Sequence, residues 1–456
     1  MKPTNNLKRF ILIAGDLFLL YATLWLTLLI RYQANPNTQL WQDHFPPFTL
    51  VFAGWILIFY ISNLYDLRLA VNNARFWQLL TRSLAISIAI AIAFFYTLPP
   101  NSIAPKTNLA IYSLVFVVLF SLWRQFYNWS LKSYLPKYQI GIIGYNDQVK
   151  ELIAELKRSP HLGYRAAFIV NDQEQTAIAA TDTPIIPSSS DLKSMVEQYH
   201  INTLIFTANP HESTELSDSL FSLIPLKINF ISLSSFYETV TGKVPITAIN
   251  RTWFLENLSE GGKSGFDSFK RTYDFILSVI LFVITLPLWL LIGLLIKLSS
   301  KGPVFFIQTR LSQNGEPFQI YKFRTMTVTG NDFSPTAKND KRVTSLGAFL
   351  RTTRLDELPQ LLNIIKGEMS FVGPRPERPE LVVDLEKIVP FYRERMLVKP
   401  GVTGWDQISG EYHSPSYEDT MKKLQYDLFY IKNRSIYLDL SIILKTIYTI
   451  LSRAGI

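Results

Sequence analysis

The sequence contains no cysteine, which excludes disulfide bonds, thiolate zinc sites and catalysis by a cysteine nucleophile. Histidine is also scarce: the five histidines are scattered, and no two have the spacing expected of metal ligands. The lack of cysteine fits any cellular compartment and therefore assigns none. The chemistry of the protein must rest on other side chains.

A complete dinucleotide-binding loop is missing as well. The segment Gly141–Asn146 follows a predicted buried strand, but it lacks the G-x-G-x-x-G spacing that lets a backbone approach a pyrophosphate. No acidic residue at the end of the next strand compensates convincingly for this lack. A nucleotide site in this region stays open, although the pattern favours a structural or regulatory module.

The region around this turn nevertheless has the texture of a soluble α/β domain. The sequence predicts a helix at Asp147–Arg158 and another within Ser188–Tyr199. Such alternation of strands and helices is typical of a doubly wound, Rossmann-like parallel sheet. The predicted strands are Gln139–Tyr145, Arg165–Val170, Pro184–Pro187, Asn202–Thr207 and Lys227–Ile231.

Long apolar stretches are abundant in this chain of 456 residues, 48% of which are hydrophobic. A bilayer core needs about 20 apolar residues per helix, and four stretches near the N-terminus approach that length. The first is not expected to be a cleavable signal, because further spans follow and no small-residue cleavage site closes it. Asp16 lies inside it, and we expect this carboxylate to be paired within the bundle or near the interface. The four predicted spans are Phe10–Ile30, Pro47–Leu64, Leu79–Leu98 and Leu109–Leu131.

The net charge of +9 could serve nucleic acid or anionic lipid, and the apolar stretches favour lipid. Basic residues cluster before the first span, between the second and third, and after the fourth, whereas the other two loops carry only Arg31 and Lys106. The positive-inside rule then places both ends of the bundle in the cytoplasm. The clustered residues are Lys2, Lys8, Arg9, Arg68, Arg75, Arg124, Lys132 and Lys137.

A fifth apolar segment, Phe275–Ile296, has basic residues on both flanks. Pro287 near its middle removes a backbone donor and would kink a helix. Because both flanks are basic, we expect a re-entrant helix that enters and leaves by the cytoplasmic face. The alternative is a fifth straight span, which would place everything after residue 300 outside the cell.

The part of the chain that follows is dense in charged and turn residues. It holds an adjacent carboxylate pair, Asp356 and Glu357, among many arginines, whose guanidinium forks match phosphate oxygens. One carboxylate could attack phosphorus while the other holds a divalent cation. The alternative is a solvated pair on a helix surface, and composition alone does not decide between the two. The segments concerned are Lys322–Met326, Arg351–Gln360, Gly373–Glu380 and Lys399–Trp405.

These segments, in this order, resemble the bacterial sugar transferase family of monotopic polyprenyl-phosphate hexose-1-phosphate transferases. The resemblance runs from about Phe269 to the C-terminus and includes Ser300–Phe306, Leu355–Leu362 and Ser370–Pro376. Four N-terminal spans and an α/β module are similar to the long form of that family. This form includes undecaprenyl-phosphate glucose and galactose phosphotransferases.

The resemblance implies roles for individual residues. It makes Asp356 the nucleophile that takes up the phosphosugar and releases UMP, and Glu357 the carboxylate that helps to hold Mg²⁺. It also makes Pro287 the break of the re-entrant helix. The expected substrates are a UDP-hexose and undecaprenyl phosphate, in the first membrane step of exopolysaccharide, capsule or O-antigen synthesis. The residues expected near the phosphates are Arg351, Arg375, Arg324 and Arg354.

Two other function classes share features with this sequence. Membrane-bound nucleotide-sugar dehydratases share the front half, but they need an NAD-binding glycine loop and a Tyr-x-x-x-Lys pair, neither of which is found. A non-catalytic scaffold for polysaccharide assembly is disfavoured by the intact carboxylate pair with its arginines. The sequence leaves open which hexose is transferred and what the α/β module binds. It also leaves open the oligomeric state, for which a homodimer is one option.

The resulting organisation has three parts: a four-span bundle in residues 1–132, a Rossmann-like module in residues 138–262, and a re-entrant helix with a small α/β catalytic domain in residues 264–456. The expected location is the bacterial inner membrane, with the catalytic domain in the cytoplasm. Because the motifs lie after Ser264, a fragment beginning there is expected to keep catalysis. Tyr437–Leu451 should form a helix on the membrane surface or on the catalytic domain.

Overall fold

The computed structural model describes most of the chain, which divides into two compact units. The N-terminal unit comprises Met1–Thr241 and the C-terminal unit Gly242–Ile456. The division of the N-terminal unit into bundle and module is visible in its separate hydrophobic cores. The described residues are 2–33, 35–67, 72–97, 105–134, 138–159, 162–171, 183–187, 191–207, 214–258, 263–327, 340, 342–409 and 416–452.

Four long helices form the bundle, as the apolar stretches predict. Each is long and apolar enough to cross a membrane. Asn37 caps the second helix by accepting a hydrogen bond from the backbone N–H of Leu40 at 2.8 Å. The helices are α1 (Lys2–Tyr32), α2 (Thr38–Ile61), α3 (Ala74–Thr97) and α4 (Pro105–Tyr134).

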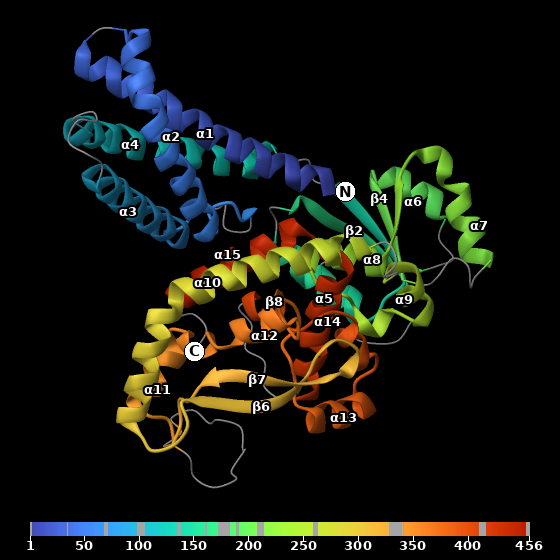
Figure 1. Cartoon of the computed structure of the whole chain (residues 1–456). Coiled ribbons are helices and arrows are strands. Elements are labelled where there is room, and N and C mark those ends of the chain that lie inside the picture. The colour runs from blue at the N-terminus through green and yellow to red at the C-terminus, as the bar shows by residue number, and fades with distance from the viewer. Residues whose placement is uncertain are drawn as a thin grey trace. The chain divides into compact units, whose positions relative to one another are not determined.

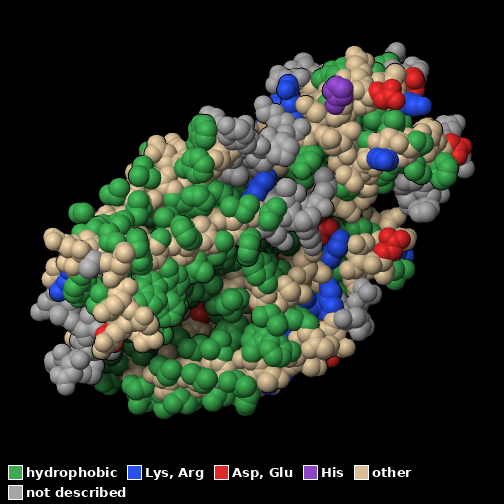
Figure 2. Space-filling model, turned by 90° about the horizontal axis from the view of Figure 1, so that it is seen from above, with side chains coloured by type: hydrophobic (Ala, Val, Ile, Leu, Met, Phe, Trp, Pro, Cys, Tyr) green, Lys and Arg blue, Asp and Glu red, His purple; other side chains and the backbone are tan. Residues whose placement is uncertain are grey.

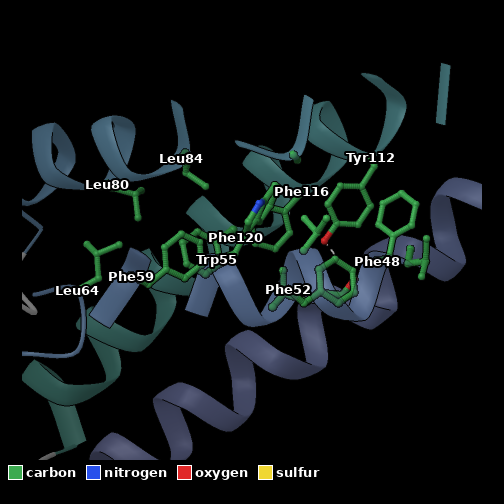
Figure 3. Close-up of a cluster of buried hydrophobic side chains, with 14 of the residues drawn as sticks. Phe48, Phe52, Trp55, Phe59, Leu64, Leu80, Leu84, Tyr112, Phe116 and Phe120 are labelled. Atoms are coloured by element: carbon green, nitrogen blue, oxygen red, sulfur yellow. Dashed lines mark hydrogen bonds between the residues drawn. The ribbon is translucent and has the colours of Figure 1, made fainter. Parts of the chain in front are cut away.

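Aromatic rings from α2 and α4 fill the core of the bundle (Figure 3). Phe59 stacks on Phe120 with ring centroids 4.9 Å apart, and Trp55 contacts Phe116 at 5.1 Å. Such pairs gain a further increment of stability beyond the area they bury. Large apolar side chains also face outward, and Figure 2 shows hydrophobic side chains over much of the visible surface. An outer surface of this kind suits helices that contact lipid.

Buried polar contacts join the helices at two levels of the bundle. Asp16 on α1 accepts a hydrogen bond from the Arg124 guanidinium of α4 at 2.5 Å, and both side chains are buried. Their pairing confirms that the carboxylate inside the first span is neutralised within the bundle. At the other level, Asn108 joins Arg31 to His44. Of the charges used to orient the bundle, Arg124 lies within α4 and not after it, so it does not report on the orientation. Arg68 and Lys137 lie outside the described residues.

The α/β module contains a five-stranded parallel sheet in the order β3-β2-β1-β4-β5. This order confirms the doubly wound sheet predicted from the alternation of strands and helices. Helix α5 spans Asp147–Arg158, and Asn146 caps it. The strands are β1 (Tyr138–Ile143), β2 (Tyr164–Val170), β3 (Ile185–Ile186), β4 (Thr203–Phe206) and β5 (Asn229–Ser232). The other helices are α6 (Leu192–Gln198), α7 (Thr214–Ser222) and α8 (Leu233–Thr241).

The C-terminal unit combines helices with two small sheets. Strands β6 and β7 pair antiparallel, and β8 and β9 pair parallel. The strands are β6 (Phe305–Leu311), β7 (Pro317–Phe323), β8 (Ser370–Val372) and β9 (Gly401–Thr403). The helices are α9 (Arg251–Asn257), α10 (Ser264–Ser299), α11 (Ser345–Thr352), α12 (Gln360–Lys366), α13 (Pro379–Ile388), α14 (Tyr417–Asn433) and α15 (Ile436–Ser452).

Helix α10 carries the fifth apolar segment, with Pro287 inside it. The helix changes direction part-way along its length (Figure 1), as a proline in a helix interior predicts. One side of the helix enters the core of the unit through Trp289, Ile292 and Ile296. Other residues remain exposed, among them Val283, Ile284, Leu290, Leu294 and Leu298.

The segment between Gly242 and Leu258 belongs to the core of the C-terminal unit. Val244, Ile246 and Trp253 are buried in one cluster with residues of α13 and α14. The indole N–H of Trp405 donates a 2.9 Å hydrogen bond to the Gly242 carbonyl. The sequence analysis places residues 242–262 in the α/β module, whereas the compact units divide at Gly242.

Candidate functional site

The carboxylate pair lies in a single 3₁₀ turn, Leu355–Glu357, between α11 and α12. Arg354 begins this turn in the left-handed region at φ 56°, which ends α11 and reverses the chain. Pro359 follows two residues after Glu357, and α12 begins directly behind it. Asp356 and Glu357 are both buried at 8% exposure, which contradicts a solvated pair on a helix surface.

Glu357 is surrounded by cations. Its Oε1 atom accepts a hydrogen bond from Lys322 Nζ at 2.8 Å, and guanidinium nitrogens of Arg375 and Arg354 lie 3.7 Å and 3.9 Å from the same atom. Burial alone would raise the pKa of the Glu357 carboxyl, but the charges of Lys322 and Arg375 outweigh it and hold the pKa at about 2. Glu357 is therefore ionised across the physiological range.

Asp356 has a different environment. Burial and the neighbouring charge of Glu357 raise the pKa of its carboxyl, and Lys322 offsets only part of this effect. Its Oδ1 atom is buried and has no hydrogen-bond partner among the described residues. A buried carboxylate oxygen without a partner is costly for stability. Adjacent carboxyls with pKa values pushed in opposite directions are a feature of active sites.

Lys322 is the main site residue that the sequence alone does not reveal. It belongs to the Lys322–Met326 motif, but the motif assigns it no role. It lies on β7 next to Phe323, which is buried against Trp289 of α10. The available signal was strand periodicity, since alternate side chains of a strand point to opposite faces. A lysine opposite a buried phenylalanine is more often a solvated residue, and for this reason the signal is weak.

Arg351 and Arg354 approach the pair from α11 and its end. The Nε atom of Arg351 donates a hydrogen bond to Thr325 Oγ1 at 2.9 Å. The backbone of α11 comes so close to Thr325 at Gly347 that an added Cβ would lie 1.9 Å from the Thr325 carbonyl oxygen. Glycine at this position therefore brings α11, and with it Arg351, against the end of the Lys322–Met326 motif.

Arg324 has contacts unlike those of the other three predicted phosphate ligands. Its guanidinium donates to the Ser300 and Lys301 carbonyl oxygens at 2.8 Å and 3.1 Å, and to Ser300 Oγ at 3.0 Å. These are groups at the C-terminal end of α10, where carbonyls lack helical partners and a cation is favourable. The structure thus brings Arg351, Arg354 and Arg375 toward the pair and uses Arg324 to hold α10. A phosphate contact for Arg324 stays a prediction.

Two arginines, one buried and one half-buried, hold the loop that carries Arg375 through hydrogen bonds to its backbone. Arg395 donates to the Arg375 carbonyl at 3.0 Å, and Arg310 donates to the Pro376 carbonyl at 3.2 Å. Glu377 pairs with Lys423, and this ammonium helps to bring the pKa of the half-buried Glu377 carboxyl to about 2 despite the opposing effect of burial. Nothing in the sequence pattern predicts this network, which holds the proline-rich turn in one geometry.

The two glycine-containing motifs that include β8 and β9 pack against each other. β8 and β9 pair so closely that a Cβ on Gly401 would lie 2.1 Å from the Gly373 nitrogen. A Cβ on Gly404 would lie 2.5 Å from the Gly373 carbonyl oxygen. The motifs ending in Pro376 and Trp405 are therefore parts of one packed element, although about 30 residues separate them.

The residues at the site fit a magnesium ion that is bound partly by substrate. Mg²⁺ prefers oxygen ligands, and it usually takes one or two carboxylates together with waters and substrate phosphates. Asp356 and Glu357 supply two carboxylates, and Asp356 Oδ1 has no partner among the described residues. Within the described part of the chain no group of three or more His, Cys, Asp or Glu residues could hold a metal ion.

Comparisons with known proteins agree with the motifs. The sequence model of the bacterial sugar transferase family matches residues 266–453. An exopolysaccharide production protein of Rhizobium leguminosarum bv. phaseoli is 40% identical over 192 residues, which cover 96% of that protein and 40% of this chain. The chain belongs to the bacterial sugar transferase family. The resemblance seen in the sequence is thereby confirmed.

Longer members of this family are also similar. A protein of Xanthomonas campestris pv. campestris named UDP-glucose:undecaprenyl-phosphate glucose-1-phosphate transferase is 39% identical over 238 residues, 51% of this chain and 47% of that protein. A UDP-N-acetylgalactosamine-undecaprenyl-phosphate N-acetylgalactosaminephosphotransferase of Aeromonas hydrophila is 40% identical over 220 residues, 48% of this chain and 51% of that protein. The chain thus spans about half the length of these sugar transferases. A second family model, described as a CoA-binding domain, matches residues 60–232.

Proposed function

We propose that the protein transfers hexose-1-phosphate from a UDP-sugar to undecaprenyl phosphate and releases UMP. The observation that carries the proposal is the buried Asp356–Glu357 pair with Lys322, Arg354 and Arg375 around it. Phosphoryl transfer needs positioned groups and neutralised negative charge, and these residues offer both. Relatives named for this class of reaction support the proposal, and glucose, galactose or an N-acetylated hexose are the candidate sugars.

In this mechanism Asp356 is the nucleophile. One of its carboxylate oxygens attacks the phosphorus that carries the sugar, and the bond from that phosphorus to the UMP oxygen breaks. UMP leaves with the bonding electron pair, and the sugar phosphate stays on Asp356. In the second step, a phosphate oxygen of the acceptor attacks the same phosphorus and frees Asp356. The unpartnered Oδ1 atom is available for the first attack.

The cationic residues would act on the donor's phosphates. Arg354 and Arg375 are partly exposed, with side chains 45% and 39% accessible, and guanidinium forks suit phosphate oxygens. Asp356 and Glu357 would hold Mg²⁺, which when bound supplies charge neutralisation on the donor's diphosphate. The residues available are oxygen donors, so Mg²⁺ or Mn²⁺ should support UMP release. EDTA should abolish it, and zinc should not substitute.

A re-entrant course of α10 would place this chemistry at the membrane surface. Near its start, Lys270 pairs with Asp439, and Arg271 donates to the Ile364 carbonyl at 2.6 Å. Near its end, the Ser300 carbonyl accepts from Arg324. All these partners belong to the C-terminal unit. A helix that crosses a hydrocarbon core of about 30 Å has its two ends on opposite sides of the membrane. The C-terminal unit could not then contact both ends of α10.

This course fits the reaction. UDP-sugars are cytoplasmic, while the acceptor phosphate lies at the headgroup level of the inner membrane. A unit anchored by α10 on the cytoplasmic face would reach both. The adjoining helix α15 packs on the unit through Ile442 and through a hydrogen bond between Thr446 and Thr403. Its exposed residues Ile436, Tyr437 and Leu440 would contact the lipid interface.

The deciding experiment is a panel of UDP-sugars with undecaprenyl phosphate, scored for UMP release by the purified full chain. We expect one or two UDP-hexoses to yield UMP and a lipid-linked product whose mass equals acceptor plus sugar phosphate. The matched control is Asp384→Asn, which removes an exposed carboxylate on α13. Absence of UMP with every donor would remove the transferase proposal and leave a non-catalytic assembly role.

A further inference from the structure

Three cations converge on a single oxygen at the candidate site. Lys322, Arg375 and Arg354 all lie within 4 Å of Glu357 Oε1. Glu357 is 8% exposed, so water screens these interactions less than it would at the surface. The local charge around this carboxylate is therefore positive before any metal or nucleotide has entered.

Such an environment opposes the binding of a free divalent cation. A metal ion on Glu357 would approach three positive charges at short range, and a partly buried site strengthens this repulsion. The only further carboxylate in the pair is Asp356, and the described residues include no group of three or more Asp, Glu, His or Cys side chains that could hold a metal ion together. A diphosphate would reverse the balance, because its negative charge neutralises the cations and its oxygens complete the metal's ligand shell.

The closest cation has properties that the other two lack. The Lys322 ammonium contacts Glu357 Oε1 at 2.8 Å, whereas the arginines lie beyond ordinary hydrogen-bond distance. A lysine ammonium is a compact charge on a flexible stem, and it can leave one oxygen for another. The backbone of Lys322 is fixed, since β7 pairs with β6 and Phe323 packs on Trp289. The side chain can therefore move while its strand does not.

From this geometry, and resting on the proposed function, we propose that Lys322 is a positioning residue that occupies the cation position on Glu357 in the free enzyme. The donor diphosphate and its divalent cation then enter together. The cation takes the place of the ammonium, and Lys322 turns to a phosphate oxygen. No covalent bond changes in this exchange. Its consequence is that the enzyme binds a metal–diphosphate complex and has little affinity for the metal alone.

The test measures Mn²⁺ binding to the purified full chain in detergent, by electron paramagnetic resonance, without nucleotide. Lys322→Gln removes the competing charge and should bind Mn²⁺ at least about tenfold more tightly than the unmodified chain. Lys322→Arg keeps the charge and should bind as weakly as the unmodified chain. The matched control is Lys366→Gln, which removes an exposed lysine whose ammonium donates a hydrogen bond to the Tyr321 hydroxyl.

A second measurement uses UDP, which offers the diphosphate but no sugar to transfer. Calorimetry should show that UDP binds the unmodified chain at least about tenfold more tightly with Mn²⁺ present than without it. That ratio should fall in Lys322→Gln. A purely structural role for Lys322 would weaken Mn²⁺ binding in this variant or leave it unchanged.

The proposal is overturned if Lys322→Gln binds free Mn²⁺ no better than Lys366→Gln, or if the unmodified chain binds Mn²⁺ equally well with and without UDP. Melting temperatures of all variants show whether each chain is folded. Neither measurement depends on turnover. Failure of UMP release with both binding results intact would therefore refute the proposed reaction and not the role of Lys322.

Discussion

The rings of Phe282 and Trp289 meet edge-on with centroids 5.1 Å apart, on either side of the proline that interrupts α10. Trp289 also donates its indole N–H to Thr285 Oγ1 at 3.1 Å. Thr285 in turn donates to the Leu281 carbonyl at 2.7 Å. These contacts lie where Pro287 removes a backbone donor, and they keep the bent helix in one conformation.

The bend leads to a topological prediction. Residues on both sides of the apolar segment Phe275–Ile296 should lie in the cytoplasm. The chain has no cysteine, so Ser268→Cys and Ser299→Cys each introduce a single thiol at an exposed position. A membrane-impermeant maleimide applied to intact spheroplasts should label neither, and both should react after the membrane is opened.

Gln39→Cys, at an exposed position in the first turn of α2, is the positive control for this experiment. The positive-inside rule places this end of α2 outside the cytoplasm, so the thiol should react in intact spheroplasts. Labelling of Ser299→Cys but not Ser268→Cys from outside would show that α10 crosses the membrane. The C-terminal unit could then not reach cytoplasmic UDP-sugar.

A second prediction concerns Asp356. Asp356→Asn should lower UMP release by at least about 10³-fold, because a neutral amide is a poor nucleophile toward phosphorus. Glu357→Gln should also impair the reaction, since it removes the charge that would help to hold Mg²⁺. Near-normal UMP release by Asp356→Asn, with Asp384→Asn as the folded control, would make a covalent role untenable.

A third prediction is that the two carboxyls affect stability with opposite signs. Burial raises the pKa of Asp356, so folding favours its protonated form, and its contribution to stability falls as pH rises through the raised pKa. Asp356→Asn should therefore raise the Tm of the chain at pH 7. Substitution that improves stability while removing activity is typical of active-site residues.

Glu357 is expected to behave in the reverse sense. Its pKa falls from 4.5 to about 2 on folding, so its stabilising effect is present above the ordinary value and is lost as pH drops toward 2. The change corresponds to at most roughly 3 kcal/mol, less any loss to solvent screening. Glu357→Gln should lower the Tm at pH 7. Differential scanning fluorimetry of both variants measures the signs, and a Tm that drops equally in both would contradict them.

A fourth prediction concerns the smallest active fragment. A chain starting at Gly242 should fold and keep UMP release in detergent, whereas one starting at Ser264 should be less stable. The shorter fragment lacks Val244, Ile246 and Trp253, which are buried in the core of the C-terminal unit. Loss of one buried tryptophan side chain alone costs about 3–5 kcal/mol. Equal Tm and activity for the two fragments would show that residues 242–263 are dispensable.

Much of the fold was accessible from the sequence, because its signals are local. The helix Asp147–Arg158 was predicted with the bounds that the structure shows, since Asn146 supplies a cap and basic residues close the last turn. The lengths of the apolar stretches predict the bundle helices, and Pro287 predicts the bend in α10. The adjacency of Asp356 and Glu357 is likewise a property of the chain itself.

The features that the sequence does not predict depend on packing between residues far apart in the chain. Nothing in the sequence of β7 shows that Lys322 contacts a carboxylate 35 residues later in the chain. Strand periodicity predicts the face of the strand on which a side chain lies, but it does not predict what that side chain contacts. Arg324 lies in the same motif, and its guanidinium is used at the end of α10. The segment after Gly242 has no change of composition that would assign it to the unit in which Val244 is buried.

Helix α10, which is long and apolar enough to cross a membrane, also contributes to the hydrophobic core of the C-terminal unit. Trp289, Ile292 and Ile296 of α10 pack in the same core as Phe318, Phe323 and Leu361. The remaining face of α10 is apolar and exposed. Removal of α10 would open that core, so polar substitutions intended to raise solubility must be confined to the exposed face of the helix. Proteolytic removal of α10 is therefore expected to unfold the C-terminal unit and not to release it intact.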